Sequence, residues 1–182
     1  KMIETLFKSA PLHDIGKVGI PDSILLKPGK LTGEEWTIMK THARLGCEAI
    51  EQAERDAEGP VAFLTVAKQI ALYHHEKWDG SGYPEGLAGE AIPVAARLMA
   101  LADVFDALIS RRAYKEPLPL DKAIRIIEEG RGSHFDPDIV DAFLVLRDEF
   151  AAIAQRYADH EDDLRAKQAQ RYGVAALSLR ET

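Results

Sequence analysis

Six residues in this sequence have side chains that commonly bind metal ions, namely four imidazoles and two carboxylates. They are His13, Asp14, His42, His74, His75 and Asp103. A single histidine on an apolar helix face is more often a hydrogen-bonded core residue, but four such positions together favour a metal site. Imidazole and carboxylate without thiolate suit iron, manganese or similar cations. Six ligands are too many for one ion, so we expect at least two.

Asp103 is the strongest single indication, because it lies inside the apolar run LMALADVFDALI, with Asp106 one turn later. An isolated carboxylate on a buried helix is very costly, so Asp103 needs a partner. One alternative is an ion pair with Arg97 or Arg111. The other is a carboxylate that binds metal, and we prefer this second interpretation.

Two metal ions held in this way would activate a water molecule and support displacement at phosphorus. Lys17, just after the His13-Asp14 pair, could stabilise a phosphoryl oxygen, although it could equally be an exposed loop lysine. Arg111, Arg112 and Lys115 cluster after the Asp103 helix and could hold an anion. Taken alone, that cluster could also be a solvated surface patch.

The elements that must position these residues are helical almost throughout, and we predict an all-α domain of six or seven helices. Thr32 and Glu35 form a capping box. The helix that follows should bury one face at helical spacing, made of Trp36, Met39, Ala43, Gly46 and Ile50. Pro60 should begin the next helix, whose inner side ends at His74. Residues 15–31 read as an ordered loop with one short helical turn.

The second half begins with residues 76–92, which are rich in turns and long enough to suggest a functional loop. Pro93 should begin a central buried helix. Asp121 and Gly130 bracket a short helix, and Asp136-Pro137 should start a last one that runs through Ala151. Residues 157–182 are polar on every side and read as a tail or linker helix.

Composition limits the classes of protein to which this chain can belong. The chain has 182 residues, is 46% hydrophobic and carries a net charge of −7, which suits one globular domain and excludes a disordered chain. Cys47 is the only cysteine, so a disulfide scaffold is excluded. No apolar run is long enough for a membrane helix, and the acidic balance argues against nucleic-acid binding. The start at Lys1 suggests a piece of a longer, cytoplasmic protein.

The motifs together resemble the HD-GYP family, over roughly residues 9–145 and in the family's order. The matching segments are HDIGK at 13–17, IPD at 20–22, LKPGKLT at 26–32, HHEKWDGSGYP at 74–84, ADVFDAL at 102–108 and HFDP at 134–137. The HD dipeptide alone would be uninformative, whereas this series is highly specific.

The resemblance implies a helical phosphodiesterase that hydrolyses cyclic di-GMP to pGpG or GMP with two or three divalent metal ions, commonly iron or manganese. Asp14 would bridge the metal ions, and Lys17 would lie beside the scissile phosphate. The full set of metal ligands would be His13, Asp14, His42, His74, His75 and Asp103. Arg112 and Lys115 would hold the substrate. The loop Gly82, Tyr83 and Pro84 would contact partners such as GGDEF-type cyclases or shape the site, unless it is only a tight turn.

Three departures from the family pattern qualify this interpretation. The family carries further ligands on an upstream helix that these residues lack, so we expect residues 1–156 to be an HD-GYP domain without its N-terminal helix or helices. Ile109 and Ala113 replace the usual Thr and Pro, and residues 51–61 are a few residues longer than usual. Fusion to an upstream receiver or sensor domain is expected.

Two other functions stay open at this point. One is hydrolysis of another cyclic dinucleotide, such as 3′3′-cyclic GMP-AMP. The other is a catalytically impaired module that binds a cyclic dinucleotide or a partner protein.

Overall fold

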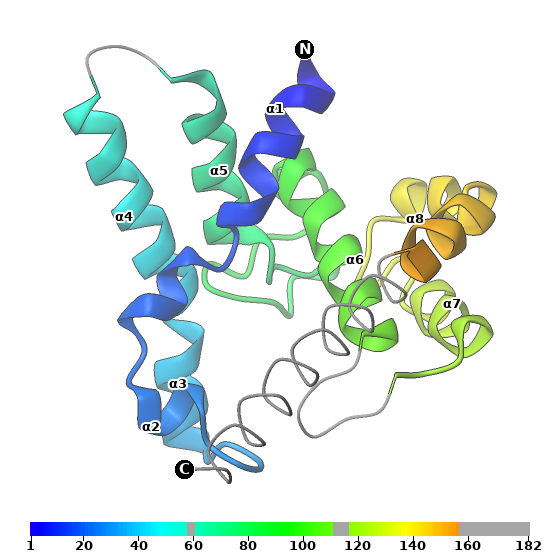
Figure 1. The fold of residues 1–182 in the computed structure, drawn as a ribbon, viewed down its shortest axis with the longest axis horizontal. Coiled ribbons are helices and arrows are strands. Elements are labelled where there is room, and N and C mark those ends of the chain that lie inside the picture. Colours follow the sequence, from blue (N-terminus) through cyan, green and yellow to red (C-terminus); the bar gives the residue numbers. More distant parts are fainter. Residues whose placement is uncertain (58–60, 111–116, 157–182) are drawn as a thin grey trace, which may run out of the picture.

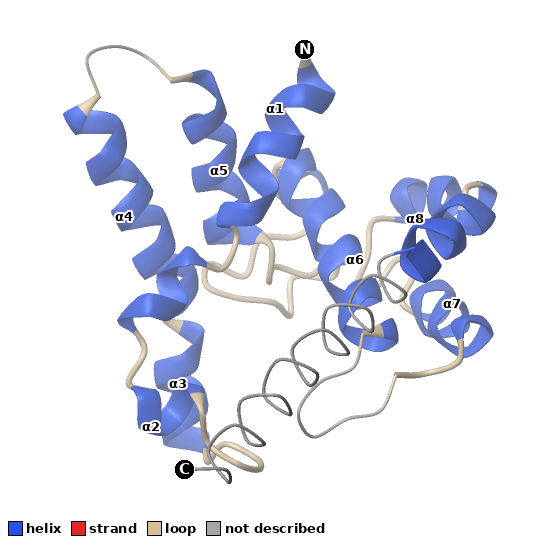
Figure 2. Ribbon diagram, in the orientation of Figure 1, coloured by secondary structure: helices blue, strands red, loops and turns tan. Residues whose placement is uncertain are grey.

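A computed structural model describes residues 1–57, 61–110 and 117–156 of the chain. Within these ranges the fold is all-α, as predicted, and no β-strand forms (Figure 2). The α-helices are α1 (Met2–Ser9), α2 (Asp22–Leu25), α3 (Gly33–Lys40), α4 (His42–Asp56), α5 (Ala62–Tyr73), α6 (Val94–Ile109), α7 (Leu120–Glu129) and α8 (Pro137–Val145). Short 3₁₀ helices cover Ala10–Leu12, Ile15–Gly19 and Gly89–Ala91. None of the described helices is long and apolar enough to cross a bilayer.

Two apolar clusters hold the helices together. In the first, α4 and α5 lie side by side (Figure 1) and bury Ile50, Leu64, Ala67 and Ala71 between them. Helix α1 covers α5 from the other side, where the buried Ser9 hydroxyl donates a 2.8 Å hydrogen bond to the carbonyl of Phe63. This half of the molecule supports the elements that carry five of the six predicted ligands.

The second cluster joins the central helix α6 to α7 and α8. Its buried members are Leu101, Phe105, Ala123, Ile127, Phe135, Val140 and Phe143. The prediction that residues after Pro93 form a central helix is confirmed, since α6 contacts both α5 and α7. Asp103 is therefore carried by the helix that connects the two halves.

The predicted continuous helix from residue 33 to about residue 50 is wrong, because the chain turns at Thr41. Both the amide and the hydroxyl of Thr41 donate to the carbonyl of Ile38, at 3.0 and 2.6 Å. These hydrogen bonds span three residues, as in a 3₁₀ turn, and not the four residues of an α-helix. Trp36 consequently does not share the buried face of Ala43 and is 48% exposed. The turn places His42 at the first position of α4.

Other boundaries differ in smaller ways. Residues 15–31 contain two helical turns, Ile15–Gly19 and α2, where one was predicted. The last helix begins at Asp136-Pro137 as predicted but is interrupted at Leu146, and helical residues resume at 147–156. The interruption redirects the chain so that the ring of Phe150 packs on Phe105 and Phe143.

Some predictions fall outside the described residues. These are the helix start at Pro60, the basic cluster Arg111, Arg112 and Lys115, the replacement at Ala113, and the polar tail at 157–182. The capping box at Thr32 and Glu35 is confirmed, with both reciprocal hydrogen bonds formed. Helix α7 starts one residue before Asp121 and ends at Glu129, with Gly130 as its C-cap, close to the predicted bounds.

Candidate metal centre

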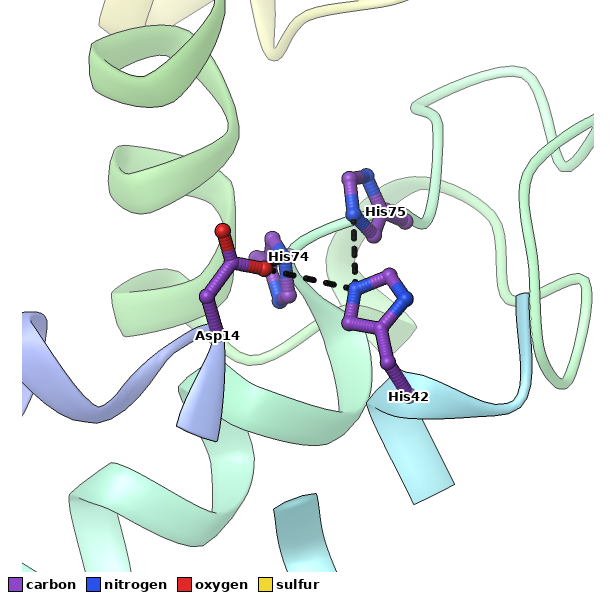
Figure 3. A group of neighbouring side chains, drawn as sticks. All are labelled: Asp14, His42, His74 and His75. Atoms are coloured by element: carbon purple, nitrogen blue, oxygen red, sulfur yellow. Dashed lines mark hydrogen bonds and ion pairs between the residues drawn. The ribbon is translucent and has the colours of Figure 1, made fainter. Parts of the chain in front are cut away.

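Four of the predicted ligands converge on one point. Asp14, His42, His74 and His75 each offer a ligand atom, and these atoms lie within 4.8 Å of one another. Figure 3 shows the four side chains pointing inward from different elements. Asp14 precedes the 3₁₀ helix Ile15–Gly19, His42 begins α4, and the two adjacent histidines follow α5.

Backbone carbonyls orient three of the imidazoles. The Nδ1 atoms of His13, His42 and His74 lie 2.9, 2.7 and 2.8 Å from the carbonyls of Ala10, Met39 and Ile70. Only a protonated Nδ1 can donate to a carbonyl, so in a neutral ring the lone pair is on Nε2. Each of these Nε2 atoms faces the Asp14 carboxylate. This arrangement is typical of histidines that bind metal through Nε2.

The Asp14 carboxylate lies between two sets of donors. Its Oδ1 is 3.4 Å from Nε2 of His42 and 3.8 Å from Nε2 of His74. Its Oδ2 is 3.3 Å from Nε2 of His13, and the same His13 nitrogen is 3.8 Å from Oδ1 of Asp103. One carboxylate that faces two separate donor sets has the geometry of a bridging ligand.

The chemistry of these atoms fits a cation. Oδ1 of Asp14 and Nε2 of His74 are both buried, and the structure gives neither a hydrogen-bond partner among the described residues. A buried polar atom without a partner costs free energy, and a metal ion between these two atoms would remove that cost. The residues present therefore fit a divalent cation of the kind that binds nitrogen and oxygen.

The electrostatics favour an ionised carboxylate among neutral imidazoles. Burial opposes ionisation of Asp14, but the adjacent His13 and His74 rings and the Lys17 ammonium hold the pKa of its carboxyl well below the usual range. Burial and the neighbouring His74 and His42 lower the pKa of His75 to about 2. Burial also lowers the pKa of His42.

His13 behaves differently. Burial lowers its pKa, but the Asp14 carboxylate, the Ala10 carbonyl and Asp103 outweigh burial, and the pKa is raised overall. His13 and Asp103 thus form an edge of the centre that is richer in negative charge. The alternative partner for Asp103 on its own helix is wrong, since Arg97 pairs with Asp136 at 2.6 Å; Arg111 is outside the described residues.

Lys17 lies beside the centre. Its ammonium donates to Oδ2 of Asp14, and the side chain is 39% exposed. The lysine is therefore held by the carboxylate and still open to a ligand arriving from solvent. This position separates it from an ordinary surface lysine.

The Gly82–Pro84 loop also reaches the centre. The Tyr83 ring stacks on His75 with centroids 4.8 Å apart, and its edge meets Trp36 at 6.4 Å. Beyond Tyr83 lies a hollow of about 270 Å³ lined by Thr37, Lys40, Thr41, Arg44, Tyr83 and Pro84. The loop is thus one wall of the site, and Trp36, predicted as core, is part of the same wall.

Glu76 was not among the predicted site residues. It is 2% exposed, and its carboxylate accepts three backbone N–H bonds from residues 85–87. The sequence offers one indication of a role for Glu76, namely its position directly after His75 and before a glycine-rich segment. Its three partners come from sequence-distant amides, which residue types do not reveal.

Comparison with known proteins agrees with this site. The HD domain family profile matches residues 2–139. Two Vibrio cholerae proteins, named probable cyclic di-GMP phosphodiesterase and cyclic di-GMP phosphodiesterase, are 62% and 63% identical over 160 and 157 residues. These alignments cover 88% and 86% of this chain but 36% and 32% of theirs.

A further Vibrio cholerae protein, named 3′3′-cGAMP-specific phosphodiesterase 2, is 47% identical over 151 residues, which cover 83% of this chain and 28% of that protein. The chain spans about a third of the length of the curated relatives that it matches. The helical fold, the histidine and aspartate centre and these matches show that the chain belongs to the HD domain family, in its HD-GYP branch.

Proposed function

We propose that this chain is the phosphodiesterase module of a bacterial signalling protein and hydrolyses cyclic di-GMP to pGpG, GMP or both. The observation that carries the proposal is the Asp14 carboxylate, which faces His42 and His74 with one oxygen and His13 with the other, while Asp103 lies beside the same His13 nitrogen. The names of the relatives at 62% and 63% identity support the choice of substrate.

Two or three divalent ions, iron or manganese, would be held by His13, Asp14, His42, His74, His75 and Asp103. Such ions, when bound, would lower the pKa of a water molecule, so that it could attack phosphorus as hydroxide near neutral pH. Asp14 would bridge them, because its two oxygens face different donor sets. The lowered pKa values of His42 and His75 keep these two imidazoles neutral at pH 7, which leaves their lone pairs available as ligands.

Lys17 would place positive charge beside the scissile phosphate. The ammonium is anchored on Asp14 and partly open to solvent, so it can donate to a non-bridging phosphoryl oxygen while charge develops there. Arg112 and Lys115 would hold the substrate's phosphates or guanines. Those two roles stay predictions.

The hollow beside Tyr83 suits a nucleotide. It combines an aromatic ring with the cations Lys40 and Arg44, and the Lys40 ammonium lies 5.8 Å from the ring centroid. Aromatic faces and cations together favour bases attached to phosphates. The same Gly82–Pro84 loop could instead contact a GGDEF-type or other signalling protein, and a cytoplasmic setting with an upstream receiver or sensor domain would fit that use.

Two alternatives are kept. The relative named 3′3′-cGAMP-specific phosphodiesterase 2 makes that dinucleotide a second candidate substrate. A non-catalytic module that binds a cyclic dinucleotide or a partner protein is the third possibility.

The test is a paired assay on protein purified without oxygen. Bound iron and manganese are quantified, and cyclic di-GMP and 3′3′-cyclic GMP-AMP are followed separately by chromatography. We expect about two metal ions per chain, with pGpG or GMP as product. Asp14→Ala should lose both metal and turnover, whereas Asp22→Ala, an exposed aspartate on α2, should keep both.

Turnover that persists in Asp14→Ala would contradict the mechanism. Faster hydrolysis of 3′3′-cyclic GMP-AMP would favour the second substrate. Metal binding and dinucleotide binding without turnover would favour the non-catalytic module.

A further inference from the structure

The loop that follows His75 is organised around a buried carboxylate. Glu76 is 2% exposed, and its Oε1 accepts the amides of Glu85 and Gly86 at 2.7 and 3.1 Å. Its Oε2 accepts the amide of Leu87 at 3.0 Å. Burying a carboxylate is costly unless it is fully hydrogen-bonded, and these three amides meet that need. They also tie the end of the loop to its beginning.

Gly82 lets the middle of the loop pack against the backbone of Glu76 and Lys77. A Cβ atom on Gly82 would lie 2.4 Å from the Lys77 nitrogen and 2.5 Å from Cα of Glu76. Only glycine therefore allows the chain to pass directly over the 76–77 backbone. The next amide, of Tyr83, donates to the carbonyl of His75 at 3.2 Å.

These contacts fix the Tyr83 ring over His75. The two rings are stacked with centroids 4.8 Å apart and an interplanar angle of 25°. The pKa of the Tyr83 hydroxyl is raised by burial, and by the nearby Asp14 and Asp103. The ring is thus half-buried against the centre.

His75 needs such a support more than the other histidines do. The Nδ1 atoms of His13, His42 and His74 are bonded to backbone carbonyls. Within the described residues, the hydrogen bond that the structure gives the His75 ring is that of Nε2 with His42. Its orientation therefore depends on packing: the Tyr83 ring stacks on it at 4.8 Å between centroids, and the neighbouring His74 ring lies tilted against it at 4.0 Å.

We propose that Glu76 is a positioning residue for the metal centre, holding Tyr83 over His75 and so keeping the His75 imidazole directed at Asp14 and His42. The inference rests on the proposed function, because it takes His75 to be a metal ligand. Glu76 itself acts through the loop, and its carboxylate is engaged by residues 85–87.

The first measurement is hydrogen exchange by mass spectrometry on metal-free protein, comparing wild type with Glu76→Gln. Glutamine keeps one oxygen but turns an NH₂ group toward an amide that needs an acceptor. We expect exchange at residues 85–87 to rise about tenfold to a hundredfold, with exchange in α5 and α6 unchanged. Glu90→Gln is the matched control, since Glu90 lies in the same loop and is exposed.

The second measurement is the affinity for Co²⁺ by calorimetry, with the visible spectrum of the bound ion as a signature of its ligands. Glu76→Gln should bind Co²⁺ about 10–100-fold more weakly and shift the spectrum, while Glu90→Gln matches wild type. Tyr83→Ala should reproduce the weaker binding and leave the amides of residues 85–87 protected, because it removes the ring without touching Glu76.

Released amides with unchanged Co²⁺ affinity and spectrum would overturn the proposal and leave Glu76 a loop residue only. Unchanged affinity in Tyr83→Ala would also overturn it, and this variant decides the matter if Glu76→Gln fails to fold. A wild-type chain that binds no metal contradicts the proposed function instead, and the exchange data on the metal-free protein still report whether Glu76 holds the loop.

Discussion

The Nε2 atoms of His42 and His75 lie 3.2 Å apart, although the two residues are 33 positions apart in the sequence. The Nδ1 of His42 donates to the Met39 carbonyl, so its Nε2 offers a lone pair toward His75. The low pKa of His75, about 2, keeps that ring neutral near pH 7. Together with the nearby Asp14 carboxylate, these two neutral rings form a nitrogen and oxygen donor set that suits a divalent cation.

Gly16 makes this convergence possible, and replacing it should weaken the centre. A Cβ atom at residue 16 would lie 1.9 Å from the His42 carbonyl oxygen and 2.4 Å from the Gly46 nitrogen. Gly16→Ala must therefore push the Asp14 segment away from α4. We expect about 10–100-fold weaker Mn²⁺ binding and a loss of about 1–3 kcal/mol in unfolding free energy, measured by calorimetry and urea unfolding.

Gly33→Ala is the matched control, because a Cβ atom there meets nothing within 4 Å and the residue begins α3. It should bind Mn²⁺ like wild type. If folded Gly16→Ala also binds Mn²⁺ like wild type, the close approach of Asp14 to α4 is not what forms the site.

The sequence was sufficient for features set by local chemistry. The capping box at Thr32 and the N-cap at Asp136 depend on residues within three positions of each other, and both formed as predicted. The candidate metal ligands could be named because imidazoles and carboxylates are rare in apolar helices. Their convergence on Asp14 then followed from the fold.

Features set by tertiary contacts could not be predicted in the same way. The turn at Thr41 interrupts an otherwise helical pattern, and it exposes Trp36, which then meets the edge of Tyr83. Glu76 depends on amides nine to eleven residues away, in a loop whose path no periodicity describes. Arg97 pairs with Asp136 across the helix packing and not with Asp103, the alternative partner considered from the sequence.

Lys17 should contribute to turnover more than to metal binding. Its ammonium contacts Asp14 but remains partly exposed, so Lys17→Ala removes positive charge near the phosphate and leaves the histidines in place. We expect kcat to fall about 10²–10³-fold, with the metal content per chain unchanged. Steady-state kinetics on cyclic di-GMP and elemental analysis of the same samples check this.

Lys30→Ala serves as the control for Lys17, since Lys30 is an exposed lysine in the loop before α3. It should keep wild-type kcat. If Lys17→Ala loses metal together with activity, the lysine supports the centre itself and does not act on the phosphate.

His134 should make the stability of the metal-free protein depend on pH. Burial and the nearby Lys77 lower its pKa in the folded state, so the unfolded chain binds the proton more readily. The stabilisation is therefore complete above the unfolded value of about 6.5 and is lost as the pH falls below it. Urea unfolding at about pH 8 and about pH 5.5, in the presence of a chelator, measures this loss.

His134→Gln should reduce that loss of stability without removing it, because His42 and His75 also have lowered pKa values and contribute in both proteins. The variant also loses the stacking of His134 on Phe135, but that loss is nearly the same at both pH values and cancels in the comparison. Equal losses in the two proteins would show that His134 is protonated as readily in the folded chain as in the unfolded one. A larger loss in the variant would reverse the sign and contradict the lowered pKa directly.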